Sequence, residues 1–435
     1  MGHGILQPMD GTATISGRWA TWLFPALAAL LFVLEMARTP SVHQDFAPLY
    51  AASVLASRGQ LSEAYVTDPV KLKRAGPGLT EAAHERGYPI RHLSRYLHPP
   101  AMAGLFLPLT VLNFPAAAYL FRTLSLLALV AAAFLLARMA GRQLSMGAPV
   151  LLGLLFFDPV RMTLDLGQTN LFVLALVLYA LQSRNAVRSG VALGLAALFK
   201  TFVLAIPCLW LVAGGNDKAR KSGLTGLSVL AGLHATAYLF FPEGTFAWAD
   251  MLSHLSGWQF LWPEQQSVAS QVARVLNDFS ADDVIQWTHR TLPLGEAGFF
   301  PVAWGLIIGG AAVALAYWKR PDRVASGVLA LCAGLLASPV LHSHYGIMLL
   351  VAAAWVVQRG RWDLAAGLCL AGIGLQAVPL HSDEGAFWVP LTTGLGTHWV
   401  FVTYRLAGIV AGLAGVVLAA TQGQEAGKPD TNGRA

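Results

Sequence analysis

Long apolar runs dominate this sequence and decide what kind of fold it can adopt. A helix needs about 20 apolar residues to cross a bilayer, and stretches of roughly that length recur along the chain. They are residues 19–37, 115–137, 147–163, 168–183, 222–241, 298–318, 324–340, 345–358, 363–379 and 398–420. The 435 residues are 55% hydrophobic and only 12% charged, which is about half the charged fraction of a soluble domain. The sequence therefore predicts an all-α polytopic membrane protein.

Charge asymmetry decides two regions whose length is ambiguous. Residues 101–114 are too short to cross comfortably, and residues 190–214 are long enough for one span but carry Lys200 at their centre. Short loops rich in Lys and Arg face the cytoplasm; here they are ARMAGRQ, SRNAVRS, NDKARK, WKRPDR and QRGRW. All of them face inward together only if 101–114 lies on the outer surface and 190–214 forms two short helices with Lys200 at their outer turn. We therefore expect about 12 transmembrane helices, with both termini in the cytoplasm.

This topology gathers the large loops and most polar residues on one side. It puts loops 38–100 and 242–297 outside, within a single domain over residues 1–420, and leaves a polar cytoplasmic tail, 421–435, that is predicted to be disordered. The polar residues expected outside are Asp45, His98, Asp165, Gln168, Asn170, Lys200, Gln265, Gln266, His342 and His344. We expect a protein of the cell (inner) membrane whose chemistry takes place on the periplasmic or extracellular side.

The remaining composition excludes other classes of protein. A net charge of +6 needs no nucleic-acid partner, because basic residues anchor the inner loops. Cys208, Cys332 and Cys369 all lie in apolar segments and fit small core residues better than a disulfide or a metal site. The run at 19–37 has no convincing cleavage site after it, so we expect an uncleaved anchor.

Asp45, in the stretch SVHQDFAPLY, follows the first apolar run by a few residues. It fits the role of a solvated loop acid or of the N-cap of the helix APLYAASVLASR. A carboxylate beside apolar groups near a membrane is also a natural general base, because desolvation raises its pKa towards the working range. The local sequence leaves both interpretations open.

Lys200 is the most costly residue to place. A lysine inside an apolar stretch is expected to meet an anion, such as a lipid phosphate, unless its ammonium group snorkels to the interface. His98 precedes Pro99 and Pro100, which favour a helix start, so its role is either geometric or a substrate contact.

Two further stretches offer polar groups. LHSHYGIM puts His342 and His344 at the mouth of a helix, where imidazole facing a phosphate or hydroxyl fits better than a zinc site that lacks matching ligands. WPEQQSVASQVARVL begins an outer-loop helix. Its Gln266 and Ser267 either cap that helix or hydrogen-bond a polyol.

The motifs taken in order resemble glycosyltransferase family 87, whose members are polyprenyl-phosphate-sugar-dependent enzymes of the GT-C superfamily. The resemblance spans roughly residues 40–350 and rests on QDF, HPP, LGQTNL, GLAALFKTFVLAIP, EQQSVASQVARVL and SPVLHSHYGIMLL. It implies a GT-C-like bundle with outer-face juxtamembrane helices, and it makes Asp45 the catalytic base. The chain departs from the family at His98, where tyrosine is common, and at Gln265, where asparagine is common.

The resemblance implies inverting transfer of a mannose- or arabinose-like sugar from a polyprenyl phosphate to a glycan or glycolipid hydroxyl. We expect Asp45 to take the hydroxyl proton, and Lys200 and His344 to stabilise the leaving phosphate. The other expected substrate contacts are His98, His342, Gln168, Asn170, Gln266 and Ser267. No cofactor or metal is expected, and the remaining partners are membrane lipids.

Two other classes of protein remain as alternatives. A secondary transporter fits 12 helices, but transporters usually show paired repeats and polar sites at the membrane midplane, and neither is evident here. A scaffold without catalysis leaves Asp45, Lys200 and His344 without a role.

Overall fold

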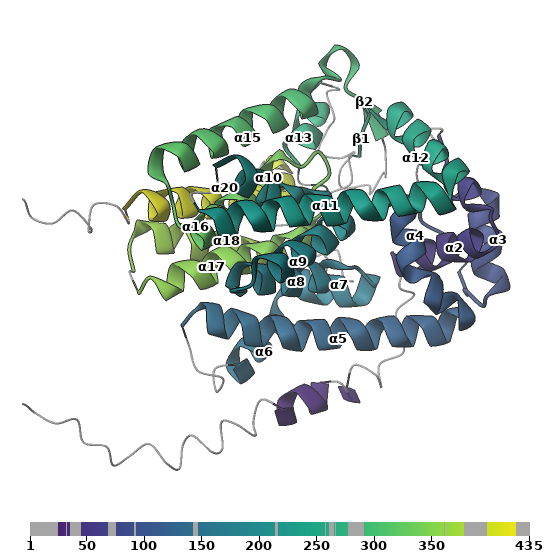
Figure 1. Cartoon of the computed structure of the whole chain (residues 1–435), viewed down its shortest axis with the longest axis horizontal. Helices are drawn as coiled ribbons and strands as arrows, with labels where there is room; N and C mark the ends of the chain where they lie inside the picture. Colours follow the sequence, from purple (N-terminus) through teal and green to yellow (C-terminus); the bar gives the residue numbers. More distant parts are fainter. Residues whose placement is uncertain are drawn as a thin grey trace, which may run out of the picture.

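A computed structural model shows a helical protein with one small β-ribbon (Figure 1). It describes residues 25–31, 33–34, 45–67, 75–90, 93–141, 147–213, 216–256, 258–260, 265, 267–276, 291–360, 362–377 and 398–422. Strands β1 (Trp258–Phe260) and β2 (Thr291–Pro293) pair antiparallel, with Gln259 opposite Leu292. Apart from this ribbon, the described residues confirm the predicted all-α class.

Four helices of the described chain are long and apolar enough to cross a membrane: α5 (Phe114–Met139), α11 (Asp217–Phe240), α15 (Phe300–Lys319) and residues Arg405–Gln422 of α20 (His398–Gln422). Shorter apolar helices occupy most of the other predicted spans. They are α8 (Asn170–Gln182), α9 (Ala186–Phe199), α10 (Ala205–Ala213), α16 (Arg323–Ala337), α17 (Leu349–Gln358) and α18 (Leu364–Ala377). The total of 12 membrane helices stays a prediction.

The continuous span predicted over 147–163 is wrong. The chain forms α6 (Gly147–Phe156) and α7 (Asp158–Leu166), which meet at an angle of 72°. Phe157 between them has an extended backbone, and Pro159 lies in the first turn of α7. Proline is accepted in the first turn of a helix but breaks one from inside, so α7 starts anew. The pair is at most one broken span.

The predicted division of 190–214 into two short helices is confirmed. Helix α9 ends at Phe199, Lys200 is extended (φ −145°, ψ 111°), and the 3₁₀ turn η4 (Thr201–Leu204) leads into α10. The break brings Lys200 to the end of a helix, where its side chain reaches groups beyond the apolar packing of α9.

Small residues let neighbouring helices approach closely. A Cβ atom added to Gly194 in α9 would lie 2.7 Å from the carbonyl oxygen of Gly226 in α11, and one added to Gly372 in α18 would lie 2.6 Å from that of Gly408 in α20. Such contacts are typical of helix pairs in membranes, where packing replaces the hydrophobic effect as the source of association.

A separate hydrophobic core lies at one end of α5 and α11 (Figure 1). It contains α2 (Phe46–Ser57), η1 (Leu61–Ala64), α3 (Pro77–Glu85), α4 (Pro100–Phe106), η2 (Leu107–Val111) and part of α12 (Pro242–Leu255). Phe46 stacks on Phe121 of α5 at 4.4 Å between ring centroids, so the residue after Asp45 is fixed to a long helix. The short α4 and η2 agree with the expectation that residues 101–114 are too short to form a span.

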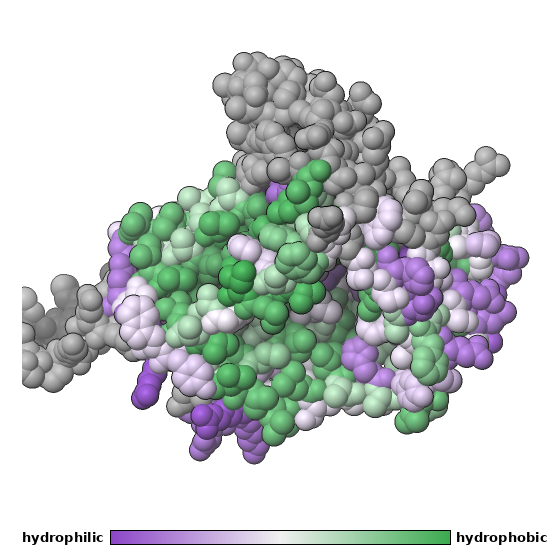
Figure 2. Space-filling view, turned by 90° about the horizontal axis from the view of Figure 1, so that it is seen from above, coloured by the Kyte–Doolittle hydropathy of each residue, from purple (hydrophilic) through white to green (hydrophobic). Residues whose placement is uncertain are grey.

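The surface agrees with a protein that crosses a membrane. Seen from above, a mainly apolar face covers the body, and polar residues gather at the end that carries α2 and α3 and again towards the opposite end (Figure 2). The remaining described elements are α13 (Val268–Leu276), η5 (Gly295–Ala297), η6 (Ser343–Met348) and the helical residues 25–31 and 33–34.

Two glycines of α11 allow a matched test of the close packing. A Cβ atom on Gly223 would lie 2.6 Å from the Pro207 carbonyl oxygen, whereas one on Gly232 meets nothing within 4 Å. We expect Gly223→Ala to lower the thermal unfolding temperature, because overpacking costs about 1–3 kcal/mol. Gly232→Ala should leave it unchanged or raise it, since alanine favours helix. Equal unfolding temperatures for the two variants would contradict the close α10–α11 contact.

Candidate active site

Four helix ends meet at one group of polar side chains, the polar cluster of Asp45, Gln168, Lys200 and Tyr345. Asp45 precedes α2, Gln168 lies in the turn from α7 to α8, Lys200 lies between α9 and η4, and Tyr345 lies in η6. Breaks in regular structure free polar groups from helix packing, so the cluster forms where apolar segments end.

Asp45 occupies the N-cap position of α2, but its side chain makes no capping hydrogen bond. Its carboxylate oxygen Oδ2 instead accepts a hydrogen bond from the Gln168 amide Nε2, and its backbone N–H donates to Leu166 O at 3.0 Å. Asp45 is therefore neither a helix cap nor a solvated loop acid: its carboxylate is bound by the Gln168 side chain.

Gln168 owes its place to a left-handed glycine. Gly167 ends α7 with φ 69°, a conformation that glycine adopts without steric cost. The next N–H, that of Gln168, donates to Thr163 O at 2.9 Å. The Gln168 side chain then reaches Asp45 on one side and accepts from Lys200 Nζ at 3.0 Å on the other.

Lys200 is buried, with 7% of its surface exposed. Besides Gln168, its ammonium donates to the Tyr345 hydroxyl at 3.1 Å and lies 4.5 Å from the centre of that ring. The polar groups and the cation–π contact replace part of the hydration that burial removes. Lys200 is thus bound by the protein and does not merely snorkel.

The two histidines adjoin this group. The rings of His342 and His344 stack at 5.3 Å, and Tyr345 packs edge-on against both. His344 is 2% exposed, and its ring nitrogens have no hydrogen-bond partner among the described residues. Gln265 braces the segment, since its Oε1 accepts from the Leu341 N–H at 2.7 Å.

Burial sets the protonation of the groups outside the apolar helices. It raises the pKa of Asp45, while the Gln168 hydrogen bond and the Lys200 charge partly oppose that rise. Burial and the charge of Lys200 lower the pKa of His98 and of His342 to about 3, although both residues keep part of their surface accessible. These two imidazoles are therefore neutral near pH 7.

The other predicted substrate contacts do not belong to the polar cluster. Asn170 is fully buried, and its Nδ2 donates to Thr163 Oγ1 at 3.3 Å. Ser267 Oγ accepts from the Ser270 N–H at 3.1 Å, which makes it a cap at the start of α13. His98 lies close enough to Lys200 for that charge to help lower the His98 pKa. Gln266 lies outside the described residues.

An ion pair with a buried arginine, beside the cluster, was missed from the sequence. Arg405 of α20 is fully buried, and its Nη2 donates to Asp158 Oδ2 at 2.5 Å. Its Nη1 lies 4.0 Å from Met162 Sδ, which also accepts from Ser343 Oγ at 3.5 Å. The pair joins α20 to the start of α7, next to η6. Its signal was Arg405 itself, a charge within the span predicted at 398–420.

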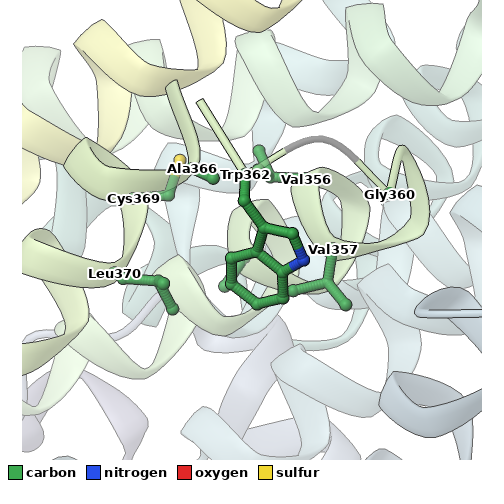
Figure 3. A pocket seen from close by; sticks show the side chains of 8 residues that line it. Val356, Val357, Gly360, Trp362, Ala366, Cys369 and Leu370 are labelled. Carbon is green, nitrogen blue, oxygen red and sulfur yellow. The ribbon is translucent and has the colours of Figure 1, made fainter. Parts of the chain in front are cut away.

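An apolar recess lies at the end of α17 opposite η6 (Figure 3). It is lined by Ala353, Val356, Val357, Gly360, Trp362, Ala366, Cys369 and Leu370. Its described lining carries no charged side chain, and it lies at the other end of α17 from η6, so polar chemistry is not expected there.

The chain matches known proteins over most of its length. The model of glycosyltransferase family 87 matches residues 96–339, more than half of the chain. Two curated relatives are named polyprenol-phosphate-mannose-dependent alpha-(1-2)-phosphatidylinositol pentamannoside mannosyltransferase. The one from Mycobacterium tuberculosis is 24% identical over 73% of this chain and 72% of its own length. The one from Mycolicibacterium smegmatis is 25% identical over 73% of this chain and 75% of its own length. No solved structure matches the chain.

The ion pair of Arg405 and Asp158 supplies a stability test. Arg405→Met leaves the Asp158 carboxylate without its partner; breaking a fully buried pair costs about 3–5 kcal/mol, and the cost here is smaller because the Asp158 side chain is 15% exposed. We expect a clear fall in thermal unfolding temperature, largely recovered in the neutral double variant Arg405→Met/Asp158→Asn. The control is Arg58→Met, whose pair with Glu85 at 2.6 Å is exposed and worth at most about 1 kcal/mol. A single Arg405→Met variant that unfolds with the control would contradict the pair's structural role.

Proposed function

This chain belongs to glycosyltransferase family 87, and from that premise we propose that it transfers a sugar from a polyprenyl-phosphate donor to a hydroxyl group of a glycan or glycolipid. The observation that carries the proposal is the chain of hydrogen bonds from Asp45 through Gln168 to Lys200. It holds one carboxylate and one buried cation side by side, which are the two charges that such a transfer needs.

Lys200 is suited to the donor phosphate. An ammonium group has three N–H donors. Among the described residues, Gln168 and Tyr345 accept hydrogen bonds from two of them. The third remains for a phosphate oxygen. As the bond from the sugar to the phosphate breaks, negative charge builds on that oxygen, and a preorganised cation stabilises it. His344, which lies against Tyr345, offers an imidazole to the same phosphate.

Asp45 is suited to the acceptor. Its carboxylate takes the proton of the acceptor hydroxyl while the hydroxyl oxygen attacks the anomeric carbon. One carbon–oxygen bond forms as another breaks, the proton stays on Asp45, and the polyprenyl phosphate leaves with the electron pair. Attack from the face opposite the leaving group inverts the anomeric carbon. His98 and His342, being neutral, are suited to hydrogen bonds with sugar hydroxyls.

The relatives narrow the substrate. Both carry names that specify polyprenol-phosphate mannose as donor and a phosphatidylinositol mannoside as acceptor. We therefore place a mannose donor before an arabinose-like one, and a glycolipid before a free glycan. The alternative of a secondary transporter is not favoured, because the family is one of glycosyltransferases. The roles proposed for Asp45 as a base and Lys200 as a phosphate-binding cation are those of a transfer reaction.

Asp45→Asn is the direct test of the reaction. Asparagine keeps the size of the side chain but cannot take a proton, so transfer should fall by roughly 10² or more. The measurement uses purified protein in nanodiscs with polyprenyl-phosphate mannose and phosphatidylinositol mannoside, followed by mass spectrometry of the product. The matched control is Asp250→Asn on the exposed face of α12. Wild-type turnover in Asp45→Asn would rule out Asp45 as the base.

The side of the membrane is tested by labelling. In a protein without its native cysteines, Glu81→Cys in α3 and Arg320→Cys after α15 are both exposed positions. An impermeant maleimide added to intact cells should label position 81 at once and position 320 only after lysis. The opposite pattern would place the polar cluster on the cytoplasmic side and overturn the proposed outer-face reaction.

A further inference from the structure

The two ends of the Gln168 amide face opposite charges. An ammonium group can only donate hydrogen bonds, so the group that faces Lys200 must be the amide oxygen, at 3.0 Å from Nζ. The amide nitrogen is then left to face Asp45 Oδ2. The reverse orientation would set NH₂ against NH₃⁺ and a carbonyl against a carboxylate. Lys200 therefore fixes the orientation of Gln168 by charge.

The orientation of the Gln168 amide affects the protonation of Asp45 and determines which of its oxygens is used. A donor amide on Oδ2 favours the ionised carboxylate. Among the described residues, Asp45 has this one side-chain hydrogen bond, on Oδ2. The other oxygen, Oδ1, is therefore left for an acceptor hydroxyl. The titratable groups that face Asp45 in the described chain are Lys200 and the phenol of Tyr88 after α3.

The backbone reinforces the arrangement. The end of α7 accepts the Asp45 N–H at Leu166 O, and the same turn holds the Gln168 N–H on Thr163 O. One short turn therefore fixes both the main chain and the side chain of Asp45. Both ends of the Gln168 amide have a protein partner, which leaves one N–H and one oxygen lone pair for any further contact.

We propose that Gln168 is a positioning residue that holds Asp45 ionised and aligned as the base and links it to the lysine that receives the donor phosphate. This inference rests on the proposed function and adds a positioning role to the substrate contact predicted for Gln168 from the sequence. Occupation of Lys200 by the phosphate and the basicity of Asp45 then depend on each other through one amide.

The test is the pH dependence of kcat/KM, which reports groups of the free enzyme. Gln168→Met keeps the length of the side chain and removes both hydrogen bonds. The carboxylate loses a donor, the pKa of Asp45 rises, and the acidic limb of the profile moves to higher pH. The expected move is about 1 to 2 pH units, the equivalent of one hydrogen bond to a charged group. KM for the donor should change little compared with kcat.

A second variant keeps the test valid if Gln168→Met does not fold. Gln168→Glu has nearly the same shape and still accepts from Lys200, but it sets a carboxylate against Asp45. The acidic limb should move at least as far as in Gln168→Met. The matched control is Gln182→Met at the other end of α8, where the amide nitrogen donates to Leu135 O at 2.8 Å; its limb should stay at the wild-type pH.

Two results would overturn the inference. A raised KM with an unmoved acidic limb would make Gln168 a substrate contact. Wild-type values of both would make it a spacer. These failures differ from failure of the proposed function, which would appear as no transfer by the wild-type protein or as full activity in Asp45→Asn.

Discussion

The buried ammonium of Lys200 is the group on which the rest of the site depends. A lone cation within an apolar bundle is costly, and the chain meets that cost by ending α9 at Phe199 and presenting Nζ to Gln168 and Tyr345. Each of these partners then holds another part of the site. Gln168 reaches Asp45, and Tyr345 packs against His342 and His344. A charge that the sequence places at the centre of an apolar stretch thus organises segments that are far apart along the chain.

Long apolar runs, and single charges next to or inside them, could be recognised from the sequence because a charge in apolar surroundings is costly. The charge pattern of the loops predicted the division of 190–214, and Asp45 and Lys200 were predicted site residues for the same reason. The bend at Phe157 was missed, although Pro159 marked it. Gln168 was recognised as polar, but its partner lies 123 positions away, and no local pattern reveals such a contact. For Ser267 the sequence left two roles open, a helix cap and a substrate contact; its hydroxyl caps α13, and the substrate contact stays a prediction.

Another buried charge, Arg405, serves the scaffold that carries this site. Arg405 and Asp158 join α20 to the start of α7, and the far end of α7 carries Leu166, which accepts the Asp45 N–H. Glycine contacts hold α9 to α11 and α18 to α20. The groups proposed as base and phosphate-binding cation therefore lie at turns between helices, and the described helices behind them are joined by close packing and by the Arg405–Asp158 pair.

The most direct measurement of the central claim is a structure of the protein with a non-hydrolysable phosphonate analogue of polyprenyl-phosphate mannose. The account predicts a phosphonate oxygen within about 3 Å of Lys200 Nζ, with the anomeric carbon on the side of Asp45 and Gln168 still between the two charges. A phosphonate bound away from Lys200, with the ammonium still joined only to Gln168 and Tyr345, would contradict the claim that this lysine receives the donor.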